Sequence, residues 1–290
     1  MPSLATSRRL GRAEVLRLLD DAGVVPSKAL GQHFVVDPNT VERVVRLAGV
    51  GPGEHVLEVG PGLGSLTLAL AGTGAAVTAV EIDERLVALA RRVLPDSVRL
   101  VHADALAIDW GPLVADAGAA GCSLVANLPY GVATPLVLGL LERTPAVRRM
   151  LVMVQREVAE RLAAPPGGRG CGAPSVRVAY FARARVVGRV GPDVFFPRPR
   201  VESALLEVER RAAPAVDPAL ASYEEIAALV RAGFAGRRKM LRRSLAGIVA
   251  PEAFGAAGVD PTARAEELDV AAWGKLAACA RSATSSPTPS

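Results

Sequence analysis

The feature that most constrains the fold is an alternation, from Gly53 to about Gln155, of short β-branched apolar runs with helix-compatible stretches. Parallel strands buried on both faces have this composition, and each needs a crossover, usually a helix, before the next strand. Residues 83–94, for example, carry apolar side chains at helical spacing. The pattern predicts an α/β domain with a largely parallel sheet. The predicted strands are residues 55–60, 76–82, 98–103, 123–128 and 149–155.

The second half of the chain changes character twice. A Gly/Pro-rich stretch at residues 163–175 predicts a loop, and two further strands are expected in residues 176–190 and 202–210. Past a linker at residues 212–219 the pattern becomes helical. The expected parts are an N-terminal helical extension (1–27), the α/β domain (28–211), a small all-helical domain (212–280) and a disordered tail (281–290).

Length, charge and cysteine content bound the class of protein. A chain of 290 residues with 50% hydrophobic content can bury a sizeable core. No run approaches the roughly 20 apolar residues that cross a bilayer, and the first residues lack the apolar segment of a signal peptide, so a cytoplasmic protein is expected. Three cysteines without a CxxC pair indicate neither a disulfide framework nor a metal site. The formal charge of +5 suits a phosphate-rich partner, although many basic proteins bind no nucleic acid.

A glycine-rich turn, EVGPGLG at residues 58–64, follows the first predicted strand directly. Glycines such as Gly60 and Gly62 let the backbone pass close beneath a nucleoside cofactor, where a Cβ atom would collide. The spacing is not the GxGxxG of dinucleotide sites, so a dinucleotide is disfavoured. The turn alone is also compatible with a tight strand-to-helix connection that binds nothing.

Acidic residues at the ends of the next two strands support a nucleoside site. Glu81 follows the turn by about 20 residues, where a carboxylate can accept hydrogen bonds from both ribose hydroxyls. Asp104 follows the third strand, from where it can accept from an adenine amino group. Each acid alone is equally compatible with a solvated strand end, and the combination with the glycine turn favours binding. The adjacent Ile82 and Ala105 are included in the predicted cofactor site.

The tetrapeptide Asn127-Leu128-Pro129-Tyr130, at the end of the fourth strand, narrows the reaction class. An adenine amine is a poor nucleophile because its lone pair is delocalised into the ring. Acceptors for its two hydrogens, the Asn127 side-chain oxygen and the Leu128 or Pro129 carbonyl, favour a tetrahedral nitrogen aimed at a methyl donor. Pro129 fixes the backbone and Tyr130 offers a face for an extruded base. In isolation the tetrapeptide is better explained as a turn that ends a strand. Its place on the fourth strand of a sheet with a glycine turn reverses this preference and favours catalysis.

A second aromatic is expected on the opposite side of the base. Phe195 and Phe196 are adjacent in the segment VFFPRP, residues 194–199. We expect Phe195 to stack on the base and Phe196 to lie in the core, the alternative being that both are core residues.

Together these motifs resemble the ribosomal RNA adenine N6-dimethyltransferase family, most closely its bacterial small-subunit (16S) group. The similarity runs from about Lys28 to Leu245. Gly131 where the family usually has Asn, Val35 for Leu, Glu202 for Asp, and the loop at residues 164–174 depart from the family pattern. The segments that carry the similarity are LGQHF, VLEVGPGLGSLT, VEIDERL, HADAL, NLPYGVATP, VQREVAERL, FFPRPRVESA and GRRKMLRRSL.

The resemblance implies a Rossmann-like class I methyltransferase domain, with a mostly parallel seven-stranded sheet covered by helices on both faces. It implies S-adenosylmethionine as the methyl donor. The implied substrate is 16S RNA in an immature small ribosomal subunit, where two adjacent adenines near the 3′ end each receive two methyls. A monomer without metal is expected. The residues implied to line the cofactor site, over which residues 32–34 close, are Gln32, His33, Val35, Gly60, Glu81, Asp104 and Asn127.

A dense basic segment lies in the predicted helical domain. At helical spacing its members form pairs that share a face, which predicts a surface suited to RNA phosphates. An ordinary solvated face is the alternative. Arg198 and Arg200 are further candidates near the target nucleotide. The cations of the segment are Arg237, Arg238, Lys239, Arg242 and Arg243.

Three other functions stay open at this point. An enzyme that dimethylates 23S RNA and confers macrolide resistance would share the catalytic core, although GRRKMLRRSL and FFPRPRVESA favour the small-subunit group. A non-catalytic ribosome assembly factor would have no need of Glu81, Asn127, Pro129 and Tyr130. An NAD-dependent oxidoreductase would need a fingerprint that this glycine turn lacks.

Overall fold

The computed structural model describes residues 10–236 and 238–284, which form two compact units. The first unit comprises residues up to 159 together with 185–209. The second comprises residues 160–184 together with those from 210 onward. Within the described residues, no helix is long and apolar enough to cross a membrane.

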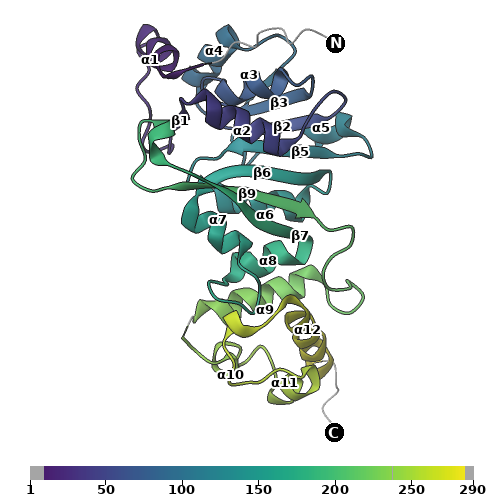
Figure 1. Ribbon diagram of the computed structural model, residues 1–290. Coiled ribbons are helices and arrows are strands. Elements are labelled where there is room, and N and C mark those ends of the chain that lie inside the picture. Colours follow the sequence, from purple (N-terminus) through teal and green to yellow (C-terminus); the bar gives the residue numbers. More distant parts are fainter. Residues whose placement is uncertain (1–9, 237, 285–290) are drawn as a thin grey trace. The chain divides into compact units, whose positions relative to one another are not determined.

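A seven-stranded sheet is the centre of the first unit, in the order β4-β3-β2-β5-β6-β9-β7 (Figure 1). The pairs β4/β3, β3/β2, β2/β5 and β5/β6 are parallel, and β9 is antiparallel to β6. The inner strand β2 is buried along its whole length, as expected for a sheet covered on both faces. The strands are β2 (His55–Val59), β3 (Ala76–Glu81), β4 (Arg99–His102), β5 (Cys122–Asn127), β6 (Val147–Gln155), β7 (Ala182–Val190) and β9 (Ser203–Arg210).

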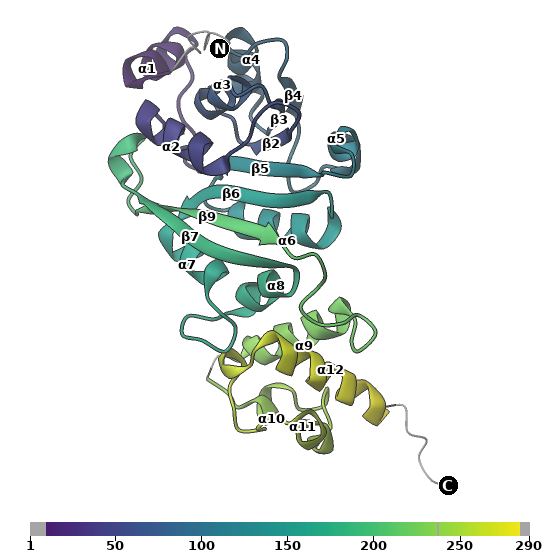
Figure 2. The same cartoon turned by 45° about the vertical axis from the view of Figure 1, so that its right-hand side comes forward.

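Helices cover both faces of this sheet. Val41 and Val44 of α2 pack with Val56 and Val77 of the sheet in one apolar cluster. Helix α6 packs on β6, and the two views show it on the face opposite α2 (Figures 1 and 2). The helices and turns of this unit include α1 (Arg12–Asp21), α2 (Pro38–Ala48), α3 (Ser65–Ala71), α4 (Glu84–Val93), α5 (Gly111–Val114), η1 (Ala115–Ala117), α6 (Ala133–Arg143) and η2 (Pro192–Val194). Helix α7 (Arg156–Ala163) crosses into the second unit.

A separate two-stranded sheet joins distant parts of the first unit. Strand β1 (Phe34–Val35) pairs antiparallel with β8 (Phe195–Phe196), so that Phe34 lies opposite Phe196 and Val35 opposite Phe195. A further bond from the Val36 N–H to the Val194 carbonyl, 2.8 Å long, extends this pairing. The segment before α2 is thereby held against the segment before β9.

The second unit is helical around a buried Trp273. Residues 173–181 form helix α8, although a strand was expected from residue 176 onward, and Val176 and Tyr180 enter the apolar cluster of this unit. Burial against the other helices outweighs the β propensity of valine and tyrosine. Residues 160–184 therefore belong with the C-terminal helices, although the sequence pattern placed the boundary after 211. The other elements are α9 (Tyr223–Ala235), α10 (Leu241–Ser244), α11 (Pro251–Ala257), η3 (Ala265–Glu267) and α12 (Val270–Thr284), which continues past the expected tail boundary at 281.

Candidate functional site

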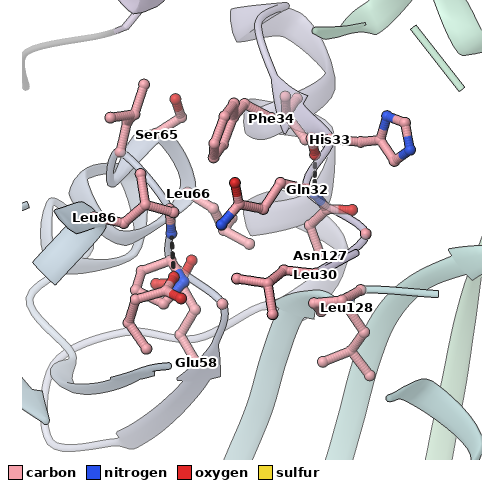
Figure 3. A pocket seen from close by; sticks show the side chains of 18 of the residues that line it. Leu30, Gln32, His33, Phe34, Glu58, Ser65, Leu66, Leu86, Asn127 and Leu128 are labelled. Atoms are coloured by element: carbon pink, nitrogen blue, oxygen red, sulfur yellow. Dashed lines mark hydrogen bonds between the residues drawn. The ribbon is translucent and has the colours of Figure 1, made fainter. Parts of the chain in front are cut away.

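A pocket opens at the carboxyl ends of β2, β3 and β5, the edge at which open parallel sheets bind ligands (Figure 3). Its cavity volume is about 70 Å³, and residues 30–35 form one wall of it. Of the predicted site, the pocket is lined by Gln32, His33, Val35, Gly60, Gly62, Glu81, Ile82, Asn127, Leu128, Pro129 and Tyr130.

The glycine turn forms the floor of the pocket. Gly60 and Gly62 have φ angles of 70° and 57°, in the left-handed region that side chains other than glycine avoid. A Cβ atom on Gly62 would lie 2.8 Å from Cδ1 of Phe34, whose ring is buried in β1. A Cβ on Gly60 would lie 3.5 Å from Cδ of Pro129. Both positions therefore need glycine for the backbone conformation, and Gly62 needs it also because a Cβ atom would collide with the Phe34 ring.

Replacing Gly62 by alanine is expected to destabilise the protein more than the same change at Gly258. Both residues have a positive φ, of 57° and 66°, but a Cβ on Gly258 meets nothing within 4 Å. The control, a left-handed residue at the end of α11, thus carries only the conformational strain, about 1–2 kcal/mol. Gly62→Ala also displaces the Phe34 ring and adds a packing cost of about 1–3 kcal/mol. Urea unfolding of both variants measures the difference, and equal losses would show that the ring contact is unimportant.

Glu81 is held rigidly at the end of β3. Its side chain is only 5% exposed, and its oxygens accept the N–H groups of Gly62 (3.1 Å), Ile82 (2.9 Å) and Asp83 (3.0 Å). A carboxylate has about four acceptor positions, so one remains, on Oε2. Burial raises the pKa of Glu81, and the three N–H groups oppose this shift. The acid is therefore pre-oriented to accept from a hydroxyl group in the pocket.

Glu58 is a second acid of the pocket, and no role was predicted for it from the sequence. It is 1% exposed, and its Oε2 has no hydrogen-bond partner among the described residues. Burial, reinforced by the nearby charge of Glu81, raises the pKa of Glu58 to about 8. The sequence feature that could have predicted a role for Glu58 is a charged residue inside an otherwise apolar strand, directly before the glycine turn. Two buried acids favour a ligand that carries positive charge and hydroxyl groups.

The amide of Gln32 fastens the wall of the pocket from both of its ends. Its Nε2 donates to Oδ2 of Asp83 (2.9 Å), and its Oε1 accepts the Ser27 N–H (2.7 Å). Asp83 caps helix α4, and the hydrogen bond from Arg85 lowers the pKa of Asp83 to about 2. Gln32 therefore anchors the wall to a permanently ionised helix cap.

The orientation of the Asn127 amide is settled by a single contact. Its Nδ2 donates to the His33 carbonyl at 2.9 Å, so Oδ1 is the atom left to accept from a ligand (Figure 3). The Leu128 N–H donates to the Met153 carbonyl of β6 (3.0 Å), which fixes the peptide group between Asn127 and Leu128. The Pro129 carbonyl already accepts the Val132 N–H at 3.0 Å. The sequence left two carbonyls as candidate acceptors for the amine, those of Leu128 and Pro129. The Leu128 carbonyl is the better candidate, because that of Pro129 already accepts a hydrogen bond.

Tyr130 is half-buried and held at two points. Its hydroxyl lies 3.2 Å from Oγ of Ser203, and its ring stacks on that of His33 with centroids 5.4 Å apart and planes at 30°. Burial raises the pKa of Tyr130, so its hydroxyl stays protonated at neutral pH. The aromatic face predicted from the sequence is therefore present at the mouth of the pocket.

The structure buries Phe195 and leaves Phe196 half-buried, contrary to the expected arrangement of the two phenylalanines. Phe195 is 2% exposed and packs in the apolar core with Val35, its partner across the strand pair. Phe196 is half-buried, and the guanidinium of Arg12 lies 5.7 Å from its ring centroid. Side chains alternate between the two faces of a strand, so the pairing with β1 decides which ring points inward. In this structure Phe195 is thus a core residue rather than an exposed stacking surface.

Two predicted cofactor residues lie outside the cavity lining. Asp104 follows β4, is exposed, and accepts the Leu106 N–H at 2.8 Å through Oδ1. Ala105 is buried, and its carbonyl accepts from Nε1 of Trp110. Both follow the strand next to β3, so they share the carboxyl edge of the sheet with Glu81 without reaching the enclosed space.

The described residues of the predicted basic segment are exposed, but they do not share one helix. Lys239 lies in a turn, and only Arg242 and Arg243 lie in helix α10, which begins at Leu241 after Met240 in an extended conformation. The shared helical face predicted for the segment is therefore not formed. Arg237 lies outside the described residues, and Arg238 is exposed in the same turn as Lys239.

The arginines of the FFPRPR segment are also exposed. The Nε of Arg198 lies 3.3 Å from Oδ1 of Asp193, and both side chains are largely solvated. Arg200 is exposed three residues before β9. Neither lines the pocket, but both follow Phe196 closely in the chain.

Comparison with known sequences identifies one family. The model of the family described as ribosomal RNA adenine dimethylase matches residues 26–281. A protein of Bifidobacterium longum subsp. infantis named ribosomal RNA small subunit methyltransferase A is 46% identical over 94% of each chain. A protein of the same name from Kineococcus radiotolerans is 49% identical over 94% of this chain and 92% of its own.

Solved structures with the same fold agree with this identification. The 23S rRNA methyltransferase ErmE is 27% identical, with a TM-score of 0.66, over 86% of this chain and 99% of its own. A dimethyladenosine transferase from Plasmodium falciparum has a TM-score of 0.69 at 21% identity, over 83% of this chain and 94% of its own, and supports the fold alone. The expected class I methyltransferase fold with a helical C-terminal part is confirmed.

Proposed function

Because the chain belongs to the ribosomal RNA adenine dimethylase family, we propose that it dimethylates N6 of two adjacent adenines near the 3′ end of 16S RNA, in an immature small ribosomal subunit. The names and identities of the bacterial relatives support the small-subunit substrate, since the 23S enzyme ErmE is only 27% identical. The enzyme is S-adenosylmethionine-dependent, like its family. We further propose that it acts as a monomer in the cytoplasm, where ribosomal subunits are assembled in bacteria.

The residues of the pocket fit S-adenosylmethionine. The cofactor carries ribose hydroxyls and positive charge, and the pocket offers the free acceptor position of Glu81 and the unpartnered Oε2 of Glu58. Gly60 and Gly62 keep the floor free of Cβ atoms. We assign Gln32, His33, Val35 and Ile82 to the wall around the cofactor, and Asp104 and Ala105 to its adenine end. When bound, the cofactor supplies an electrophilic methyl group.

The observation that carries the catalytic assignment is the fixed Asn127 amide. With Nδ2 committed to His33, Oδ1 accepts one hydrogen of the adenine amine, and the Leu128 carbonyl accepts the other. These two acceptors favour a tetrahedral nitrogen whose lone pair is available for attack. Stacking of the extruded base on Tyr130, worth about 1–3 kcal/mol, holds the ring while the amine is oriented.

A methylation assay tests the proposed substrate. We expect transfer of labelled methyl to immature small subunits, with four methyls incorporated per subunit at completion under the proposed dimethylation of two adenines. Large-subunit RNA serves as the competing substrate, and reactions without enzyme as the control. Label that appears only in large-subunit RNA would overturn the assignment, and label in neither RNA would favour a non-catalytic role.

Substituting both Arg242 and Arg243 by alanine is expected to weaken RNA binding without changing cofactor affinity. Each lost phosphate contact lowers the slope of log K against log salt by about 0.7–0.9. Arg91 and Arg92 of α4 are also adjacent and exposed, so the same double substitution there is the matched control. RNA affinity measured from 50 to 300 mM salt separates the two pairs, because loss of two contacts makes this slope shallower by about 1.4–1.8. Equal effects of the two pairs would indicate that total charge, rather than α10, governs binding.

A further inference from the structure

His33 connects the donor side of the pocket with the side expected to receive the base. His33 lines the cavity, and the residues on either side are fixed, Gln32 by Asp83 and Phe34 by the strand pair with Phe196. Figure 3 shows its ring directed away from the part of the pocket where Glu58 and Leu66 lie. The ring therefore does not point at the cofactor floor.

The ring instead contacts two segments that flank the mouth of the pocket. Its Nδ1 lies 2.6 Å from the Pro197 carbonyl, and because a carbonyl only accepts, Nδ1 carries the hydrogen. One face of the ring stacks on Tyr130. The backbone carbonyl of His33 accepts a hydrogen bond from the Asn127 side-chain amide. One residue thus contacts the stacking ring, the segment after β8 and the amine-orienting amide.

We propose that His33 is a positioning residue that fixes the width and register of the target-base pocket. It backs one face of Tyr130 and leaves the other face for the base, and its bond to Pro197 keeps the half-buried Phe196 segment at a set distance from that face. The Ser203 hydroxyl holds the far end of Tyr130. This inference rests on the proposed stacking of the target adenine on Tyr130.

The two ring contacts can be separated by substitution. His33→Phe keeps an aromatic ring for Tyr130 but removes the donor to Pro197. His33→Asn keeps an amide N–H near the position of Nδ1 but removes the stack. His33→Ala removes both, and all three retain the backbone carbonyl that Asn127 requires. A misplacement of about 1 Å in a reacting group costs up to about 100-fold in rate, so positioning alone can produce a large effect.

The experiment measures kcat and RNA KM on immature small subunits at saturating cofactor, with cofactor Kd by calorimetry and thermal unfolding for each variant. His33→Ala is expected to lower kcat about 10- to 100-fold with cofactor Kd within about twofold of wild type. His33→Phe and His33→Asn should each recover part of kcat. Because both residues act through Tyr130, the effects of His33→Ala and Ser203→Ala should be non-additive in the double variant.

Three results would overturn the inference. A loss confined to cofactor Kd would make His33 a cofactor ligand. A lower unfolding temperature with no rescue of kcat by either conservative variant would make its role structural, and an unchanged kcat in His33→Ala would deny any role. If the wild-type enzyme methylates small subunits in the same assay, these results leave the proposed function intact. Absence of methylation by the wild type would instead reject that function, and the inference with it.

Discussion

Replacing Asn127 by alanine is expected to lower kcat for methyl transfer about 10²–10³-fold, while RNA affinity changes little. The substitution removes an acceptor that is fixed in place before the amine arrives, and loss of one such preorganised group typically has this effect. The acceptor is fixed because Nδ2 is already bonded to the His33 carbonyl. Single-turnover rates, with Kd measured separately, isolate the chemical step from binding.

The chain offers a natural control for this substitution. Asn39 is the only other asparagine in the sequence, and it lies exposed in the first turn of α2. Asn39→Ala should leave kcat unchanged. Asn127→Ala also leaves the partly buried His33 carbonyl without its donor, so a stability loss of about 1 kcal/mol is expected. Undiminished turnover by Asn127→Ala would refute the amine-orienting role.

Glu58 is expected to make the cofactor-free protein lose stability as pH rises from about 5 to 8. Its folded pKa of about 8 exceeds the unfolded value of 4.5, so in this interval the folded state holds a proton that the unfolded state has released. The stabilising contribution is therefore complete below pH 4.5 and is lost as pH rises toward 8. The expected slope is about 1.4 kcal/mol per pH unit.

Glu58→Gln is expected to remove this slope, because the amide has no proton to release. Urea unfolding at several pH values measures the difference between wild type and variant. The other acids, including Glu81 with its raised pKa, are present in both proteins and cancel. Glu209→Gln, at an exposed position on β9, is the matched control and should leave the slope as in wild type. Parallel stability curves for wild type and Glu58→Gln would mean that Glu58 is ionised in the folded protein.

Glu58 is also expected to couple cofactor binding to the release of a proton. A neutral Glu58 beside a positively charged ligand is expected to ionise, because an opposite charge within a few ångströms lowers the pKa of a carboxyl group. Binding at pH 7 should therefore release a proton. Calorimetry in two buffers of different ionisation enthalpy detects this release, and Glu58→Gln should abolish it.

The spacing of apolar residues and of glycine and proline predicted the elements whose formation depends on nearby residues in the chain. The five parallel strands, the glycine turn and helix α4 follow from apolar runs and breakers within a few residues of one another, and their bounds agree to within about two residues. Glu81 and Asn127 were found because they follow strands whose carboxyl ends must meet at one edge.

Long-range packing decided what the pattern could not. The burial of Phe195 rather than Phe196 depends on the pairing of β8 with β1, some 160 residues earlier in the chain. Residues 176–181 have strand-like composition, yet Tyr180 packs among helices of the second unit. The pattern likewise gave no sign that the Asn127 amide and the His33 carbonyl would bond across 94 residues.

The second unit is built from two separate segments of the chain, which limits where the protein can be truncated. Cys171, Val176 and Tyr180 are buried by helices that follow residue 210. A chain truncated near residue 211 would keep these three apolar side chains and lose their cover, which makes it prone to aggregate. Catalytic and RNA-binding contributions are therefore best dissected by surface substitutions in the intact polypeptide rather than by excising either half.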